Sequence, residues 1–375
     1  QILLQPLAEC LPLRATIEEM PGYTPWWQQK NGNFPLDFSV LLGQIDNLSN
    51  TTQPPLMLDF PGKRGGHTIV LGAPGSGKTT FLRTLASSLS FRYSPAQAVI
   101  YVLSFAGHSL DGLTRLPNVG DVIHGNEPER ISRLLRLLHA AIEERKVLMG
   151  GLQVDSLEKY NHHPRVTADQ RLPAIFVMID NFGELRDTAF EDEMGEIQKL
   201  LENGRNYGIF FILTALQFAG IPYKTQNIID QRIALNLTDR SDYALFVGRL
   251  QSLDFDVLPP GRGFLYGIPP LSIQLADIGD ISEDVDASSD PEKPGSLFGE
   301  IVANGKSWKG PRPTAIGVLP EWVNLSSLYP QASKPTCCLV GIDSDTLSPL
   351  KIEWTPGTHL MIGGPPQSGR TSVLH

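Results

Sequence analysis

Uninterrupted apolar runs of strand length recur along much of the chain, separated by polar or glycine-rich stretches. The runs at 98–105 and 174–180 are apolar at nearly every position, and the second ends in a carboxylate, Asp180. Such runs are typical of parallel strands buried on both faces, because an exposed face would show alternating polar residues. Strands are also predicted for the runs at 67–72, 119–123, 208–217, 232–237 and 261–267.

Helical patterns fill several of the intervals between these runs. One helix is predicted over about 77–90 and another over about 126–149, where apolar residues recur at helical spacing after a helix start signal. A third is predicted from the residues after Asp180 to about Asn203. Strands that alternate with helices predict an α/β fold with a doubly wound, mainly parallel sheet, whose ligands bind at the carboxyl ends of the strands.

The sequence at 72–79, Gly-Ala-Pro-Gly-Ser-Gly-Lys-Thr, matches the phosphate-loop pattern G-x-x-x-x-G-K-[ST] between a predicted strand and a predicted helix. Glycines let backbone N–H groups turn toward phosphate oxygens, and the helix N-terminus adds partial positive charge. In such a loop Lys78 reaches the β- and γ-phosphates of ATP, and Thr79 binds Mg²⁺. The alternative is a glycine-rich turn that binds no nucleotide. The predicted nucleotide contacts are Gly72, Pro74, Gly75, Ser76, Gly77, Lys78, Thr79 and Thr80.

A carboxylate for the magnesium site is predicted at the end of another strand. Asp180 stands where P-loop enzymes hold that carboxylate, and its alternative role is a helix cap. Hydrolysis usually requires a further group that activates water, commonly a glutamate directly after the aspartate, but Asn181 occupies this position. Glu184 is close in sequence but one helical turn away. We therefore predict that ATP is bound better than it is hydrolysed.

Two further polar residues have two interpretations each. Gln217 follows an apolar run and either senses the γ-phosphate or simply ends a strand. Arg232 begins the next run and either serves as an arginine finger for a neighbouring subunit or forms a surface ion pair. The residues alone leave both alternatives open.

The end of the chain repeats the phosphate-loop pattern with one change. Residues 364–371 keep both glycines and the hydroxyl residue, but Arg370 replaces the lysine. His67 precedes Lys78 by eleven residues, and His359 precedes Arg370 by the same number. Self-similarity at a fixed offset indicates an internal repeat.

Two upstream pairs of segments extend this repeat in the same order. The stretch at 41–46 is similar to 339–345, and the stretch at 55–60 is similar to 349–354. The segment from about 280 turns to Asp, Ser, Pro and Gly, as expected at a boundary between modules. The predicted organisation is a leading linker at 1–40, a complete module at 41–278, an inter-module linker at 279–325 and the start of a second module at 326–375.

Charge and composition limit the classes of function. The net charge of −9 and a pI near 5.4 argue against a protein whose main surface binds nucleic-acid phosphates. With 375 residues, 41% of them hydrophobic, the chain is long enough for two or three domains with a substantial core. No segment reaches the roughly 18 apolar residues that indicate a membrane span.

Several stretches together resemble the FtsK/SpoIIIE superfamily of P-loop motors, and within it the EccC/EssC ATPases of type VII (ESX) secretion. The resemblance extends from Leu7 over nearly the whole chain, and the tandem phosphate loops are its most specific feature. The stretches are GHTIVLGAPGSGKTTFLRTL, RLPNVGDVIHGNEPERISRLL, IFVMIDNFGELR, GRNYGIFFILTALQ and PPGRGFL.

This resemblance implies a RecA-like P-loop ATPase that binds ATP and Mg²⁺. It implies 72–80 as the phosphate loop, Asp180 in the magnesium site, Gln217 as the sensor and Arg232 as the arginine supplied to a neighbour. It also implies a hexamer at the cytoplasmic face of the cell membrane, with the type VII membrane complex and small helical-hairpin export substrates as partners. A membrane anchor would then belong to segments outside this chain.

Three functions compete at this point. The first is an ATP-binding module that powers or regulates protein export, which the acidic charge and the tandem loops favour. The second is a DNA translocase of the same superfamily. The third is a regulatory scaffold that binds ATP without meaningful turnover, which Asn181 keeps open because it replaces the glutamate of the family pattern.

Overall fold

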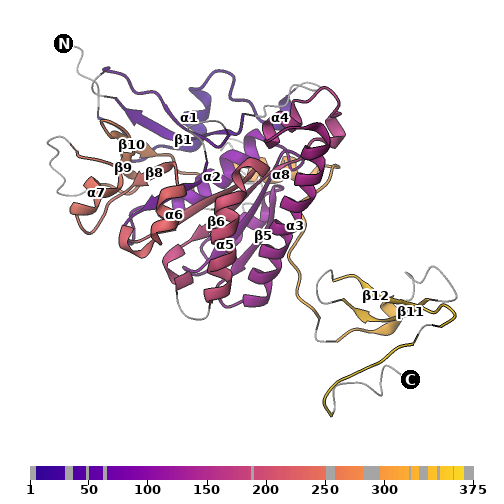
Figure 1. Ribbon diagram of the computed structural model, residues 1–375. Helices are drawn as coiled ribbons and strands as arrows, with labels where there is room; N and C mark the ends of the chain where they lie inside the picture. Colours follow the sequence, from indigo (N-terminus) through magenta and orange to yellow (C-terminus); the bar gives the residue numbers. More distant parts are fainter. Residues whose placement is uncertain are drawn as a thin grey trace. The chain divides into compact units, whose positions relative to one another are not determined.

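Two compact units, Gln1–Ala315 and Ile316–His375, make up the chain in a computed structural model of the protein (Figure 1). Each unit is described by itself. The structure describes residues 6–29, 37–47, 50–61, 66–186, 190–250, 258–279, 281, 296–320, 322–328, 337–343, 347–357 and 359–366.

A ten-stranded mixed sheet forms the centre of the first unit, in the order β2-β1-β10-β9-β8-β3-β7-β6-β4-β5. Its parallel strands are β3 (Thr68–Leu71), β4 (Ala98–Ser104), β5 (Val119–His124), β6 (Ala174–Asp180), β7 (Ile209–Ala215) and β8 (Gln231–Ala234). Its antiparallel strands are β1 (Ser39–Asp46), β2 (Pro55–Asp59), β9 (Arg262–Leu265) and β10 (Leu271–Leu275). The predicted α/β fold with a mainly parallel sheet is confirmed, and an antiparallel extension is added to it.

The parallel strands owe their position to their composition. Strands β4, β6 and β7 are buried at every residue, as their continuous apolar runs predict. Leu71 at the end of β3 lies opposite Ala215 at the end of β7, and Ser104 at the end of β4 lies opposite Asp180 at the end of β6. The phosphate-loop motif and Asp180 therefore follow strands that end at the same edge of the sheet.

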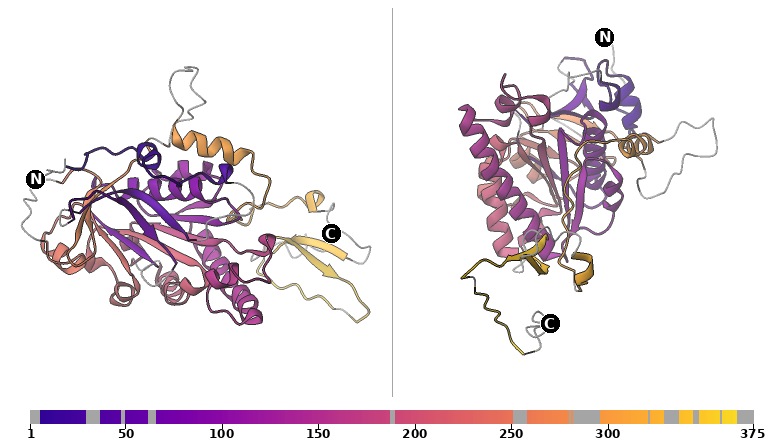
Figure 2. Two further views of the ribbon diagram at one scale, coloured as in Figure 1. Left: turned by 90° about the horizontal axis from the view of Figure 1, so that it is seen from above. Right: turned by 90° about the vertical axis from the view of Figure 1, so that its right-hand side faces the viewer.

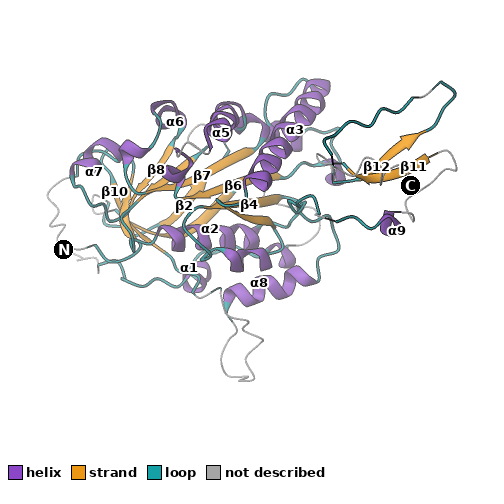
Figure 3. Cartoon of the chain, turned by 90° about the horizontal axis from the view of Figure 1, so that it is seen from below, coloured by secondary structure: helices purple, strands orange, loops and turns teal. Residues whose placement is uncertain are grey.

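Helices cover both faces of this sheet (Figures 2 and 3). One face carries α3 (Pro128–Leu152), α5 (Glu191–Asn203) and α6 (Tyr223–Ile228), and the other carries α1 (Leu13–Glu18), α2 (Lys78–Arg92) and α8 (Leu297–Lys306). Two short helices, α4 (Leu157–Asn161) and α7 (Ser241–Phe246), lie in connections. None of the helices in the described part of the chain is long and apolar enough to cross a membrane.

The segment predicted as an inter-module linker contains one of these helices. Helix α8 buries Leu297, Phe298 and Ile301 and contacts α2. Its Glu300 accepts a hydrogen bond of 2.9 Å from the guanidinium of Arg14 in α1. This part of the segment is therefore packed onto the first unit.

The helix predicted directly after Asp180 is interrupted. A short 3-10 helix, η4 (Phe182–Arg186), follows the strand, and α5 begins only at Glu191. Asn181 has a φ of 60°, a left-handed conformation that cannot belong to a right-handed helix, so no helix begins directly at the end of the strand. The prediction of one continuous helix was wrong here, because residue type did not reveal this backbone turn.

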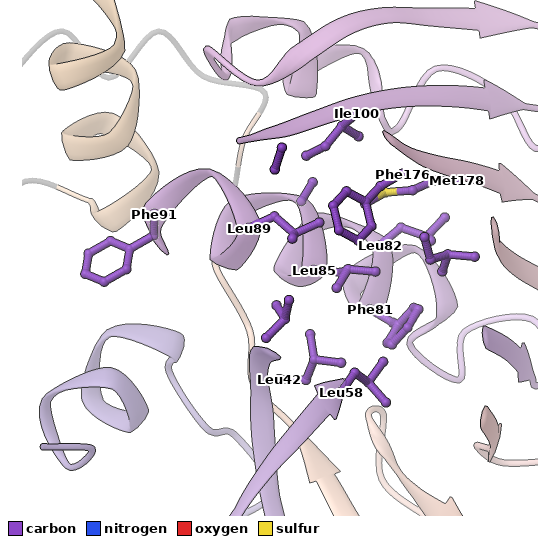
Figure 4. Close-up of a cluster of buried hydrophobic side chains, with 14 of the residues drawn as sticks. Leu42, Leu58, Phe81, Leu82, Leu85, Leu89, Phe91, Ile100, Phe176 and Met178 are labelled. Atoms are coloured by element: carbon purple, nitrogen blue, oxygen red, sulfur yellow. The ribbon is translucent and has the colours of Figure 1, made fainter. Parts of the chain in front are cut away.

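Helix α2 joins the parallel and antiparallel parts of the sheet through one apolar cluster (Figure 4). Its Phe81, Leu82, Leu85 and Leu89 are fully buried. They lie among side chains from β1, β2, β4 and β6, namely Leu42, Leu58, Ile100, Phe176 and Met178. Burial of each large apolar side chain contributes about 1.5–3 kcal/mol, so the helix that begins at the phosphate loop is firmly fixed.

A buried histidine fixes the start of the strand that leads to the phosphate loop. The backbone N–H of Phe211 in β7 donates to His67 Nδ1 at 2.9 Å, and Nε2 donates to the carbonyl of Leu201 in α5 at 2.8 Å. Burial lowers the pKa of His67 to about 4, so the ring is neutral at pH 7 and this tautomer satisfies both contacts.

The second unit contains the hairpin β11 (Cys337–Ile342) and β12 (Pro349–Glu353) and the short helix α9 (Leu325–Leu328). The strand register of the β11–β12 hairpin matches that of the β1–β2 hairpin. The bulge at Leu339/Gly341 corresponds to the bulge at Leu41/Gly43. The start of the second loop motif, 364–366, is described, while Arg370 and Thr371 lie outside the described residues.

Candidate nucleotide site

The phosphate-loop motif forms a turn that only glycine accommodates at two positions. Gly75 and Gly77 have φ angles of 77° and 107°, in the left-handed region that disfavours other residues. A Cβ on Gly77 would also lie 2.9 Å from the backbone nitrogen of Gly261. The turn ends at Lys78, where α2 begins and directs its unpaired N–H groups toward the loop.

Backbone hydrogen bonds from three other segments hold this loop. Gly72 N–H donates to the carbonyl of Ala215 at 3.1 Å, and Ala73 N–H donates to the carbonyl of Asn236 at 2.7 Å. Gly261 N–H in turn donates to the Ser76 carbonyl at 2.9 Å. The loop is thus held by the last residue of β7, by the segment that follows β8 and by the segment that precedes β9.

The ammonium of Lys78 lies inside the loop. Its Nζ donates to the carbonyls of Gly72 and Ala73, at 2.6 and 3.0 Å. Partial burial lowers the pKa of Lys78, while the nearby carboxylate of Asp180 opposes this shift. The strands that lead to Lys78 and Asp180 end at the same edge of the sheet, and this opposing effect agrees with one site for the two residues.

Asp180 is only 2% exposed, and one of its two carboxylate oxygens has a hydrogen-bond partner. Its Oδ1 accepts a hydrogen bond of 2.6 Å from the hydroxyl of Thr214 in β7. Its Oδ2 is buried and has no hydrogen-bond partner among the residues that the structure describes. Because burying an unpaired carboxylate oxygen is costly, this atom is suited to bind a cation.

The chain turns sharply after Asp180 and brings Glu184 back to Asn181. The hydroxyl of Thr214 accepts the N–H of Asn181 at 2.9 Å, and the side-chain amide of Asn181 donates to Glu184 Oε1 at 3.1 Å. Glu184 is exposed. Asn181, at the position where related enzymes hold the water-activating glutamate, and Glu184 are therefore in direct contact.

The sequence model of the FtsK/SpoIIIE family matches residues 29–251, more than half of the chain, and this stretch holds the loop and Asp180. The chain belongs to the FtsK/SpoIIIE family. In this FtsK/SpoIIIE protein the phosphate loop and Asp180 lie at the carboxyl ends of the parallel strands, where P-loop folds bind nucleotide.

Relatives in this family are proteins of type VII secretion. The chain is 28% identical to the ESX secretion system protein EccC of Thermomonospora curvata over 89% of its own length and 25% of that protein. It is also 28% identical to the ESX-4 secretion system protein EccC4 of Mycobacterium tuberculosis, over 90% of its length and 26% of that protein. The chain thus spans about a quarter of the length of these relatives.

Solved structures of the family share the fold. EssC (ATPases 2 and 3) from Geobacillus thermodenitrificans superimposes with a TM-score of 0.76 at 22% identity, over 99% of this chain and 66% of that one. EccC (ATPases 2 and 3) of T. curvata, in complex with a signal sequence peptide, gives a TM-score of 0.71 at 25% identity, over 99% and 63%. Both likenesses are consistent with the predicted RecA-like P-loop ATPase fold.

Gln217 lies near the FtsK/SpoIIIE loop and is exposed. It stands two residues after Ala215, whose carbonyl accepts the N–H of Gly72, and it precedes a short 3-10 helix (Phe218–Gly220). This position is compatible with either interpretation, a sensor of the γ-phosphate or the end of a strand.

Arg232 lies away from the loop of its own FtsK/SpoIIIE site. It pairs with Ile69 at the amino-terminal side of β3, whereas the loop follows the carboxyl end of that strand. Its guanidinium donates to the carbonyl of Gln226 at 2.9 Å and lies 5.6 and 5.9 Å from the ring centres of Tyr266 and Phe246. The structure does not bring Arg232 together with the other predicted site residues.

Two residues of the site were not predicted from the sequence. Thr214 donates to Asp180 and accepts from Asn181, and its only signal is a hydroxyl within a strand that is otherwise apolar. Gly261 supports the loop from a distant segment. Its signal is the glycine-rich stretch 259–265, which was interpreted only as part of a strand and of the family resemblance.

Proposed function

We propose that residues 41–278 form an ATP-binding module of a type VII secretion motor, which powers or regulates the export of small helical-hairpin proteins. The observation that carries the nucleotide site is the buried, unpartnered Oδ2 of Asp180, coupled electrostatically to Lys78 in a phosphate loop. The similarity to EccC and EssC supports the assignment to secretion.

Mg²⁺ fits the residues at this site. A hard cation prefers oxygen ligands, and the hydroxyl of Thr79 and the carboxylate of Asp180 supply them. The bound ion would neutralise phosphate charge. On ATP binding, Lys78 exchanges its bonds to the carbonyls of Gly72 and Ala73 for bonds to phosphate oxygens, while the loop N–H groups bind the remaining oxygens.

The remaining organisation is proposed on the same basis. Residues 1–40 and 279–325 serve as linkers that pack in part onto the first unit through α1 and α8. Residues 326–375 begin a second module, which the matching register and bulge of the two hairpins support. The assembled protein is proposed to be a hexamer at the cytoplasmic face of the membrane. The signal sequence peptide bound to the T. curvata relative supports export substrates as partners.

A test separates this function from DNA translocation. The purified chain should bind Mg-ATP and leave duplex DNA unshifted in a mobility assay at both low and moderate salt, because its net charge is −9 and phosphate contacts require clustered cations. Nucleotide affinity is measured by calorimetry in parallel. A DNA shift that weakens steeply with added salt would favour the translocase and contradict the secretion assignment.

We further expect Arg232 to act between subunits, because it lies at the opposite edge of the sheet from its own loop. Arginine fingers supplied in trans are worth on the order of 10³–10⁵ in rate, and a site without its base is expected to show less. Arg232→Ala and Lys78→Ala proteins, each inactive alone, should recover part of the parental ATPase rate when mixed. Subunit exchange is followed by fluorescence transfer, and exchange without recovery would show that Arg232 has no such role.

A further inference from the structure

Two histidines and an aspartate converge beside the nucleotide edge of the sheet, outside the site described above. His124 ends β5, His108 lies in the loop after β4, and Asp111 begins the 3-10 helix η2 (Asp111–Arg115). One ligand atom of each lies within 4.8 Å of those of the other two. The two imidazole rings are 4.4 Å apart between centroids, and they share the carboxylate.

The distances match those between ligands of one metal ion. His108 Nδ1 lies 3.0 Å from Asp111 Oδ2, and His124 Nε2 lies 3.1 Å from Asp111 Oδ1. In a tetrahedral zinc site with bonds of about 2.0–2.2 Å, neighbouring ligand atoms are about 3.3 Å apart. A metal ion would therefore need only a small rearrangement of these side chains.

One contact within the cluster is poorly explained by hydrogen bonding alone. Asp111 Oδ1 is shielded from solvent and accepts no hydrogen bond of acceptable geometry among the described residues, although His124 Nε2 lies 3.1 Å away. A shielded carboxylate oxygen without a hydrogen bond is costly, and a cation bound by Asp111 together with both imidazoles would satisfy it. The backbone of His124 is itself fixed, since its N–H donates to Glu127 Oε2 at 2.8 Å.

We propose that His108, Asp111 and His124 bind a divalent transition metal of the zinc class. Imidazole nitrogens prefer zinc, cobalt or nickel over magnesium, so the ligands select a different ion from the oxygen ligands of the nucleotide site. Three protein ligands leave a fourth position for water. The exposed fractions of the three side chains, 79%, 47% and 19%, leave a path for the ion from solvent.

This site lies beside the nucleotide site but is separate from it. Ser104 at the end of β4 pairs with Asp180 on one side and with His124 on the other. Strands lie about 4.8 Å apart, so the metal cluster is two strands, or about 10 Å, from the Asp180 carboxylate position. A bound ion would tie the loop after β4 to the end of β5 at this edge.

Cobalt(II) provides the test, because its visible absorption reports coordination directly. We expect one Co²⁺ per chain, titrated without nucleotide and in excess Mg²⁺, with a tetrahedral d–d spectrum that Zn²⁺ abolishes by displacement. His108→Gln, Asp111→Asn and His124→Gln should each weaken binding at least tenfold. A parent without this spectrum, or with affinity unchanged in all three variants, would overturn the proposal.

A matched control and a second readout exclude a folding defect. His139 Nε2 lies 2.8 Å from Glu196 Oε2, and the described residues offer no third ligand at this pair, so His139→Gln should leave Co²⁺ binding unchanged. Zn²⁺ should raise the thermal midpoint of the parent and not that of His108→Gln, whose exposed side chain can be replaced without loss of core packing. Equal loss in the control and in the three variants would show that these ligands are not a site.

Discussion

Replacing Lys78 by alanine is expected to abolish detectable binding of Mg-ATP. The ammonium is the cation at the centre of the loop, and it already makes two hydrogen bonds of 2.6 and 3.0 Å to carbonyls there. Hydrogen bonds to charged groups contribute about 1.5–3 kcal/mol each, so losing two to phosphate corresponds to a hundredfold or greater loss of affinity. Calorimetric titration with ATP in the presence of Mg²⁺ measures the effect.

Lys146→Ala is the matched control for this prediction. Lys146 is an exposed lysine on α3 that pairs with Glu143 at 2.6 Å, so its removal deletes an equal charge away from the loop. Thermal unfolding should be similar for the control and for Lys78→Ala, since neither side chain belongs to the apolar core. Equal ATP affinity in Lys78→Ala and in the parent would remove the basis of the nucleotide-site assignment.

The second large effect concerns Asn181, and we expect the parent to bind ATP far better than it hydrolyses it. An amide can hydrogen-bond a water molecule but cannot accept its proton, and general-base assistance contributes roughly 10²–10⁴ in rate. ATP would then act mainly as a stabilising ligand, in proportion to its occupancy. Asn181→Glu should raise the turnover number by a factor that approaches roughly 10²–10⁴. The turnover number is measured under conditions that assemble the subunits.

The backbone at this position limits how far the gain extends. Asn181 has a φ of 60°, a conformation that asparagine adopts more readily than glutamate, for which it costs roughly 1–2 kcal/mol. Part of the gain in rate is therefore expected to be offset by lower stability of the turn. The amide hydrogen bond to Glu184, 3.1 Å long, is lost in the same variant.

Glu184→Gln decides whether another carboxylate replaces the base. It keeps the size of the side chain and removes its ability to accept a proton, so turnover that depends on Glu184 falls in this variant. Slow turnover in the parent that is unchanged in Glu184→Gln agrees with a site that has no base. Rapid turnover in the parent that survives Glu184→Gln would show that the argument from Asn181 is wrong.

The parallel part of the fold was predictable because its signals are local. Strands β4, β6 and β7 are continuous apolar runs, and the loop at 72–79 is fixed by its glycines. The antiparallel part was not predictable in the same way. Strand β9 was expected from its apolar run, but its partners depend on chain pairing that hydrophobicity does not encode.

The same limit applies to the sites. Lys78 and Asp180 were found because each has a motif or a strand end to mark it. Thr214 was not found, because its role exists only once β7 lies beside β6 and its hydroxyl reaches Asp180. The His108, Asp111 and His124 cluster likewise arises from the pairing of β4 with β5, so spacing along the chain does not reveal it.

The support of the phosphate loop by Gly261 has a mechanical consequence. Leu275 N–H donates to the carbonyl of Gly261, whose own N–H holds Ser76, and Leu13 N–H donates to the carbonyl of Asp277, just beyond β10. Tension on the segment before β1 or on the segment after β10 therefore reaches the loop through a short series of backbone hydrogen bonds. Under the proposed function in a secretion motor, this series of hydrogen bonds would link load on the flanking segments to the binding of nucleotide.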